Sequence, residues 1–165
     1  MAASTNKKVL VARFDRETLA GFVSSPGGFE AEALELLTPE GSVLQVPYSE
    51  VKAVCFVKDF EGGETWQQQR TFLTRPKSAG LWVRLRFIDG DSIEGMVANN
   101  LMQLESNGFS IVPPDPTFHN QKIFVPRLAV TEVQVLGVIG SALKRRPAKP
   151  VEKEEGQLEM FGEHG

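Results

Sequence analysis

The stretch W-V-R-L-R-F-I-D-G-D-S-I-E-G, from Trp82 to Gly95, decides the fold of this chain. Apolar residues alternate with arginines in its first half, which is the period of a half-buried β-strand. The dipeptide Asp89-Gly90 tolerates the positive backbone angles of a tight hairpin, and the alternation resumes after it. A glycine inside the returning strand, Gly95, marks a bend or a close backbone approach, which lets a small sheet curl. The stretch therefore predicts a strand, a turn and a bent second strand.

The same pattern occurs earlier in the chain, at a constant offset of 74 residues. Asp15 and Gly21 are the earlier counterparts of the turn aspartate and the bend glycine. Further on, V-P at residues 46–47 matches V-P at residues 125–126 with an offset of 79, because the second copy has the longer polar loop. Two matching blocks in the same order indicate two copies of one module.

These copies divide the chain into four parts: a first copy at residues 1–60, a connector at 61–79, a second copy at 80–143 and a tail at 144–165. A copy of about 60 residues buries only about 60% of its unfolded surface, so we expect the two copies to pack on each other. The connector region is too apolar for a free linker, and we expect it to cover an open end of the curled sheets. Its large apolar residues are Trp66, Phe72 and Leu73, and Phe60 comes directly before it.

One segment has conflicting signals. Residues 30–37, E-A-E-A-L-E-L-L, are rich in helix formers, yet the equivalent residues 109–112 read as a strand. We follow the repeat and predict a strand over residues 33–37. The other strands predicted in the first copy are residues 9–14, 19–23, 43–46 and 51–57. The chain is thus expected to be mainly β.

Composition limits the cellular setting. No run of 18 apolar residues could span a membrane, and the N-terminal M-A-A-S-T-N-K-K lacks the apolar run of a signal peptide. The sequence therefore predicts a cytoplasmic protein. The single cysteine, Cys55, lies in an apolar run, where a small buried thiol in the core is expected.

Charge argues against strong nucleic-acid binding by the folded part. Residues 1–146 carry 16 Lys plus Arg and 16 Asp plus Glu, so the basic surplus that attracts phosphates is missing. We expect any binding of RNA or DNA to be weak and to come from basic residues of the tail. These are Lys144, Arg145, Arg146, Lys149 and Lys153.

Nothing in the sequence indicates catalysis. His119 and His164 have no cysteine or carboxylate at metal-ligand spacing, and no nucleophile with its base can be placed. Asp15 and Asp89 are interpreted as turn formers. We therefore predict that the protein is not an enzyme and has no metal and no cofactor.

Two blocks of the second copy resemble a known family. V-x-L-x-F-x-D-G-x-x-x-x-G at residues 83–95, followed by I-F-V-P-x-x-x-V-x-x-V at residues 123–133, is similar to the two sequence blocks of Sm-like small β-barrels. The resemblance implies two tandem five-stranded Sm-like barrels packed together. It also implies RNA binding, but the family's RNA-contacting positions hold other residues here, among them Leu101 and Glu105. Exposed strand edges of such sheets would also allow a homo-oligomer.

A second, partial resemblance concerns the connector. Ser92-x-x-Gly95, together with Arg70 and Arg75, is similar to the arginine loop and strand motif of cyclic-dinucleotide-binding PilZ domains. The arginines are spaced R-x-x-x-x-R where the family has R-x-x-x-R, and Gly90 stands at the family's acidic position. A PilZ-like nucleotide sensor and an RNA-binding Sm-like module are therefore the two alternative functions.

The tail contains the sharpest motif. Its first part, K-R-R-P-A-K-P-V-E-K-E-E-G, is charged and rich in proline, and it predicts disorder. The pentapeptide Q-L-E-M-F that follows resembles the Q-L-x-L-F peptide by which bacterial proteins dock on the DNA sliding clamp. In such a peptide Gln157 exchanges hydrogen bonds at a pocket rim, while Leu158, Met160 and Phe161 are apolar anchors. The sequence thus predicts a non-enzymatic adaptor that docks on a protein partner, with the sliding clamp as the suspected one.

Overall fold

The structure is a computed structural model, and it describes residues 6–24, 29, 32–58, 60, 70–100, 102, 105–114 and 120–140. Within these ranges the chain forms antiparallel β-strands, short 3-10 turns and no α-helix. The prediction of a mainly β fold is confirmed. No helix among the described residues is long and apolar enough to cross a membrane.

Within the described residues each copy supplies five strands. The strands of the first copy are β1 (Lys7–Arg13), β2 (Thr18–Val23), β3 (Ala33–Leu37), β4 (Val43–Pro47) and β5 (Val51–Val57), with the 3-10 turn Tyr48–Glu50 before β5. Those of the second copy are β6 (Gly80–Phe87), β7 (Ser92–Val97), β8 (Gly108–Ile111), β9 (Asn120–Pro126) and β10 (Val130–Ile139), with the 3-10 turn Arg127–Ala129 before β10. The strand predicted at residues 33–37 is therefore present, and tertiary pairing overrides its helix-forming composition.

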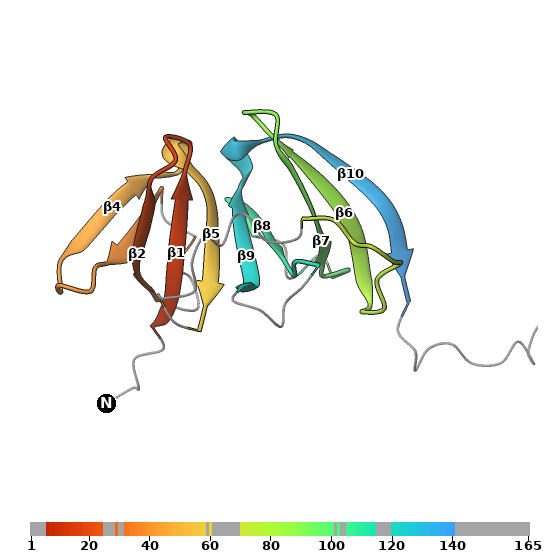
Figure 1. Ribbon diagram of the computed structural model, residues 1–165, viewed down its shortest axis with the longest axis horizontal. Helices are drawn as coiled ribbons and strands as arrows, with labels where there is room; N and C mark the ends of the chain where they lie inside the picture. Colours follow the sequence, from red (N-terminus) through yellow and green to blue (C-terminus); the bar gives the residue numbers. More distant parts are fainter. Residues whose placement is uncertain are drawn as a thin grey trace, which may run out of the picture.

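The strands form one sheet of seven, in the order β4-β3-β2-β1-β5-β9-β8, and one of three, in the order β10-β6-β7. Met96 and Val112 exchange two backbone hydrogen bonds of 2.9 Å, which link β7 to β8. The sheets are open and are not closed barrels, in contrast to the two barrels expected. The sheets differ from closed barrels because β5, the last strand of the first copy, pairs with β9 of the second copy (Figure 1).

Strand registers repeat between the copies with the offsets seen in the sequence. In the first hairpin Val9 lies opposite Gly21, and 74 residues later Val83 lies opposite Gly95. The last strands follow the same rule, since Val11 pairs with Val54 and Leu85 with Val133. The two copies therefore have the same strand order and the same registers.

Gly21 and Gly95 occupy equivalent close approaches. A Cβ atom on Gly21 would lie 2.7 Å from the side chain of Leu36, and one on Gly95 would lie 2.9 Å from that of Ile111. In each copy the third strand therefore crosses the bent second strand where only glycine leaves room.

Both aspartates act as the turn formers that the sequence predicts. A carboxylate oxygen of Asp15 accepts a hydrogen bond from the backbone N–H of Glu17, and Asp89 accepts the equivalent bond from Asp91. Gly90 has a φ of 94°, as its tight turn requires.

Two apolar clusters form the core. One lies in the first copy and includes Phe124 of the second, and the other joins Leu10 and Cys55 of the first copy to Leu85 and Phe87 of the second. Cys55 is fully buried there, which confirms the core position predicted for it. The copies therefore pack on each other.

An ion-pair cluster reinforces the contact between the copies. Lys52 of β5 is only 6% exposed, and its Nζ lies 2.6 Å from Asp89 and 2.5 Å from Asp91, both in the β6–β7 turn. Arg70 of the connector also reaches Asp91, at 3.4 Å. The turn of the second copy is thus tied to the last strand of the first and to the connector.

Part of the expectation for the connector region is wrong. Phe72 packs edge-on against Trp82, with ring centroids 6.0 Å apart, and Phe60 packs in the same way against Phe22, at 5.5 Å. Leu73 instead is 84% exposed and covers nothing. Trp66 lies outside the described residues.

Candidate functional site

The tail residues predicted to bind partners lie at positions 141–165, outside the described part of the chain. These are Gln157, Leu158, Met160 and Phe161 of the docking peptide and Lys144, Arg145, Arg146 and Lys149 of the basic segment. The candidate surfaces on the described residues lie on the sheets themselves.

The first surface is the free edge of β10. This strand pairs with β6 on one side, and no described strand pairs with its other side. Val133, Val135 and Val138 of β10 are 43%, 55% and 58% exposed. Val54, the counterpart of Val133 in the first copy, is fully buried because β9 covers the edge of β5. β10 thus combines unpaired backbone groups with exposed apolar side chains, which is the usual character of a binding edge.

The second surface is the free edge of β4. β4 is the terminal strand of the seven-stranded sheet, and β3 is its only partner among the described strands. Val43 and Leu44 are 67% and 41% exposed. In Figure 1, β4 and β10 border opposite ends of the molecule. The two open edges therefore face away from each other and cannot pair within one chain.

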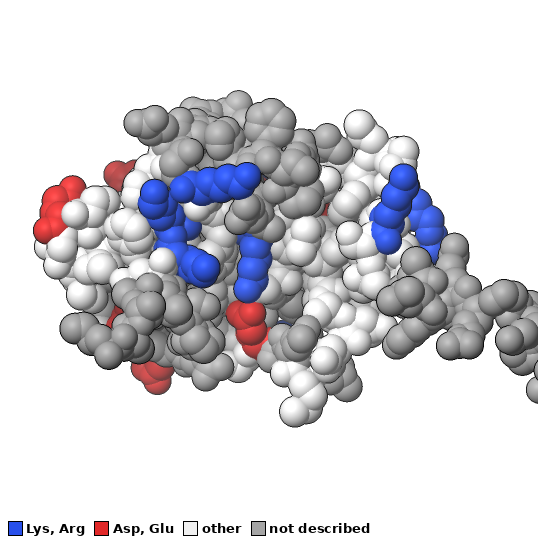
Figure 2. All heavy atoms as spheres, turned by 90° about the horizontal axis from the view of Figure 1, so that it is seen from below, with Lys and Arg blue, Asp and Glu red and all other residues white. Residues whose placement is uncertain are grey.

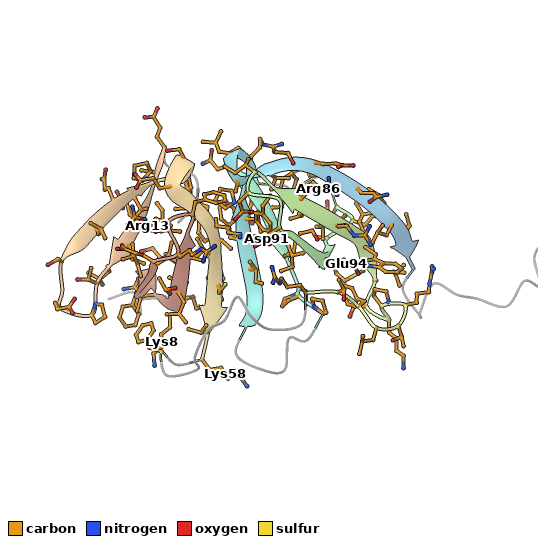
Figure 3. All side chains as sticks on the ribbon, turned by 45° about the horizontal axis from the view of Figure 1, so that its top comes forward. Lys8, Arg13, Lys58, Arg86, Asp91 and Glu94 are labelled. Carbon is orange, nitrogen blue, oxygen red and sulfur yellow. The ribbon has the colours of Figure 1, made fainter. Side chains whose placement is uncertain are left out.

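A third surface is basic and lies at the end of the sheet where β1 begins and β5 ends. Figure 2 looks onto this end and shows lysine and arginine side chains gathered there, and Figure 3 places Lys8 and Lys58 close together on it. The four exposed lysines of these strand ends are Lys7, Lys8, Lys58 and Lys122. We call them the basic end.

Two lysines of the basic end lie against aromatic rings. The Nζ of Lys8 is 5.7 Å from the ring centroid of Phe60, and that of Lys122 is 5.4 Å from the centroid of Phe56. No ion pair joins the four lysines to a carboxylate among the described residues. The neutral charge balance of residues 1–146 does not reveal this concentration of positive charge at one end of the molecule.

Arg70 and Arg75 have different surroundings. Arg70 is paired with Asp91, as described above, and its carbonyl accepts a hydrogen bond of 2.8 Å from the N–H of Glu94. Arg75 is exposed and lines a hollow of about 220 Å³ with residues that include Lys77 and Met96. The structure therefore does not bring the two arginines into one shared group of contacts.

A family model matches residues 5–137 of the chain, and its description reads "Family of unknown function (DUF6982)". The chain belongs to this family. No curated protein and no solved structure matches it. The DUF6982 match covers both copies and the connector between them, and it ends before the tail.

Glu94 of β7 is the most deeply buried carboxylate among the described residues, at 4% exposure, and the sequence did not single it out. It accepts hydrogen bonds from the backbone N–H of Phe72 (3.1 Å), from Trp82 Nε1 (3.2 Å) and from Arg84 (3.0 Å). Burial raises the pKa of Glu94, but these hydrogen bonds outweigh burial and bring the pKa below its ordinary value. Glu94 therefore fixes the connector to the second copy of this DUF6982 chain (Figure 3).

Tyr48 lies where the two copies meet. Burial raises the pKa of its hydroxyl to about 12, and the charge of Glu105 in the second copy adds to the rise. The hydroxyl thus stays protonated at neutral pH.

Among the described residues no group of three His, Cys, Asp or Glu side chains could hold a metal ion.

One buried charge did leave a signal in the sequence. Lys52 is a lone cation in the apolar run V-K-A-V-C-F-V, where an unpaired charge would be costly. That position predicts a carboxylate partner, although it does not say which one. Glu94 left no such signal, because it lies in the polar stretch D-G-D-S-I-E-G, where a charged residue is ordinary.

Proposed function

We propose that this DUF6982 protein is a non-enzymatic adaptor that binds other proteins through a free sheet edge and through its C-terminal peptide. The observation that carries the proposal is the exposure of Val133 and Val135 on the unpaired edge of β10. An edge of this kind binds an added strand through backbone hydrogen bonds, and its side chains give specificity.

The side of the sheet on which these two valines lie supports a role in binding a partner strand. They lie opposite Leu85 and Val83 of β6, whose side chains belong to the shared core. Cross-strand neighbours point to the same face of a sheet, so Val133 and Val135 face the interior of the second copy and yet remain open to solvent. An added strand would cover them as β9 covers Val54.

We further interpret each copy as a Sm-like module. The first copy has the strand order β5-β1-β2-β3-β4, and the second has the equivalent order β10-β6-β7-β8-β9 once the bridge between Met96 and Val112 is included. Five strongly bent strands in this order support the resemblance of the two sequence blocks.

The second attachment is the tail, which we propose docks on the DNA sliding clamp. The support is the resemblance of Q-L-E-M-F to the Q-L-x-L-F peptide and its place after a charged, proline-rich tether. The direct test is a titration of a fluorescent peptide covering residues 150–165 with a bacterial sliding clamp. Saturable binding is expected, and its absence up to about 100 μM, where the binding free energy is only about −5.5 kcal/mol, would refute clamp docking.

A second candidate function is nucleic-acid binding, and the basic end is the observation that favours it. Lys7, Lys8, Lys58 and Lys122 present four positive charges, two of them beside aromatic rings, a combination suited to a phosphate backbone. The tail adds Lys144, Arg145 and Arg146 a few residues after β10 ends. Binding of single-stranded RNA to the wild-type protein and to Lys8→Glu/Lys122→Glu tests this role.

A further inference from the structure

The contact between the two copies is a strand pairing with a defined register. β5 runs antiparallel to β9, with Val54 opposite Phe124, Cys55 opposite Ile123 and Phe56 opposite Lys122. In this contact the last strand of one copy pairs with the fourth strand of the other. The chain itself therefore shows how one copy adds to the next.

Both strands of this contact have free counterparts. β10 corresponds to β5 and β4 to β9, as the registers of their neighbours show: Leu34 lies opposite Val46, and Phe109 lies opposite Val125. The 3-10 turns that precede β5 and β10 are equivalent as well. The two strand edges that join the copies inside the chain are thus the same two edges that the chain leaves open at its ends.

We infer that a second copy of this protein binds at the β10 edge by adding its β4 strand antiparallel to β10. The inference rests on the proposal that β10 is a binding edge, and it names the partner. β4 and β10 lie at opposite ends of the molecule, so the contact joins chains head to tail (Figure 1). Such a contact closes a ring or extends a row, depending on the rotation between neighbours.

The register of the contact follows from the internal one. Shifting the β5–β9 pairs by the offset of 79 places Val133 opposite Gln45, Gln134 opposite Leu44, and Val135 opposite Val43. The last of these pairs joins two large apolar side chains that are 55% and 67% exposed in the single chain. Pairing would remove both from water, which is the main apolar gain of the contact.

This contact is expected to be weaker than the one inside the chain. Lys52, which joins β5 to Asp89 and Asp91, has Thr131 as its counterpart in β10. Phe124, fully buried against the first copy, has Gln45 as its counterpart in β4. Because the contact between chains lacks the buried ion pairs and the aromatic ring, chains should associate reversibly. The associated fraction should increase with protein concentration.

The first test is sedimentation velocity of the full chain and of three lysine variants between about 1 and 200 μM. The wild-type protein, 18.2 kDa as a monomer, should form larger species as concentration rises. Val135→Lys and Val43→Lys each place a charge on one edge and should weaken association at least about tenfold. Leu73→Lys replaces an exposed apolar residue that belongs to neither edge strand and should sediment like the wild type.

A mixture of the two edge variants tests the head-to-tail geometry. Val135→Lys keeps a working β4 edge and Val43→Lys keeps a working β10 edge, so an equimolar mixture should form a dimer and nothing larger. That recovery would also show that both variants are folded. Pairing of like edges, β10 with β10 or β4 with β4, would let one variant dimerise alone and would overturn the inference.

Cysteine cross-linking tests the register. A mixture of Val43→Cys and Val135→Cys proteins should oxidise to a heterodimer, because directly opposed strand residues meet the geometry of a disulfide. Val43→Cys with Val138→Cys is the matched control, three residues out of register. Equal cross-linking in both mixtures, or a wild-type monomer across the whole concentration range, would refute the β10–β4 contact. The clamp titration uses only the tail peptide, so it tests the adaptor proposal separately.

Discussion

The ammonium group of Lys52 lies 2.6 Å from a carboxylate oxygen of Asp89, and this ion pair joins the last strand of the first copy to a turn of the second. Lys52 is buried, whereas Asp89 and Asp91 are 38% and 44% exposed at their side chains. The cation is therefore the member of the cluster that depends on its partners, because the carboxylates can be hydrated without it.

Replacing Lys52 by methionine should lower the free energy of unfolding by about 1–2 kcal/mol. The charge-assisted bonds to Asp89 and Asp91 are lost, while the methionine retains much of the apolar stem. Urea unfolding at pH 7 measures the change. Lys58→Met is the matched control on an exposed lysine and should stay within about 0.5 kcal/mol of the wild type. Equal effects of the two substitutions would show that the buried cluster does not stabilise the fold.

Glu94 makes stability depend on acid pH in a defined direction. Its pKa in the folded protein lies below the ordinary value of 4.5. A depressed folded pKa contributes stability that is complete above the unfolded pKa and is lost as pH falls through the folded pKa. Wild-type stability should therefore hold from pH 7 to about 5 and decline below about 4.5.

The variant Glu94→Gln isolates this contribution. It should be less stable than the wild type at pH 7, by about 1–3 kcal/mol, because hydrogen bonds to a charged acceptor become bonds to a neutral amide. The difference should shrink as pH falls below 4.5, because the wild-type carboxyl takes up a proton as pH passes through its lowered folded pKa. Thermal melts of both proteins across this range measure it, with the exposed Glu35→Gln as control. A difference that does not change with pH would contradict the role given to the charge.

Arg16 and Gly90 occupy the same position in equivalent turns, with φ angles of 74° and 94°. The left-handed region disfavours a residue with a Cβ atom, so Arg16→Gly should stabilise the protein by about 0.5–1 kcal/mol. Gly90→Ala should destabilise the protein by a similar amount because of its positive φ. No clash adds to this cost, because no atom lies within 4 Å of the new methyl group. Arg16→Ala keeps the Cβ atom and should not reproduce the gain. Denaturant midpoints compare the three variants.

Local patterns in the sequence predicted the strands well, and their reach explains both the success and its limit. Alternation of apolar residues and the Asp-Gly turn are local, so they locate β6 and β7, and the repeat transfers them to β1 and β2. The repeat also corrected the helix-forming composition of β3. Which open edge pairs with which is not local, and for that reason the β5–β9 contact and the open sheets were not predicted.

Side-chain environments followed the repeat less closely than the backbone did. Glu94 and Lys52 have Ala20 and Thr131 as their counterparts, so comparing the copies hid the two buried charges. Leu73 shows the opposite case, because the apolar content of a connector does not require that each of its apolar residues packs. The basic end was missed because a neutral total says nothing about where charges lie.

Nucleic-acid binding by the basic end should be weak and strongly dependent on salt. Four lysine contacts to a single strand correspond to a slope of about −3 in a plot of log K against log salt concentration. Lys8→Glu/Lys122→Glu should remove most of the binding, and Lys77→Glu, on the connector, serves as the control. Fluorescence anisotropy with a labelled single-stranded RNA measures both. Micromolar or tighter binding at physiological salt would favour the RNA-binding alternative over the adaptor.

The docking peptide offers the most direct test of the proposed function, because it can be altered without touching the sheets. Leu158→Ala/Phe161→Ala in the full chain removes two apolar anchors, and buried anchors of this kind cost about 1–3 kcal/mol each on truncation. Clamp binding measured by calorimetry should fall at least about tenfold. The thermal midpoint should stay unchanged, since the family match ends at residue 137 and the described strands end at Ile139.

Glu159→Ala is the matched control within the same peptide, because its side chain faces solvent between the anchors in this arrangement. It should change clamp affinity less than either anchor does. If the affinity were lost equally with Glu159→Ala, the peptide would bind through charge and not through two apolar pockets. If the double variant bound as tightly as the wild type, the contact would lie elsewhere, and the β10 edge would be the next surface to alter, with Val135→Lys.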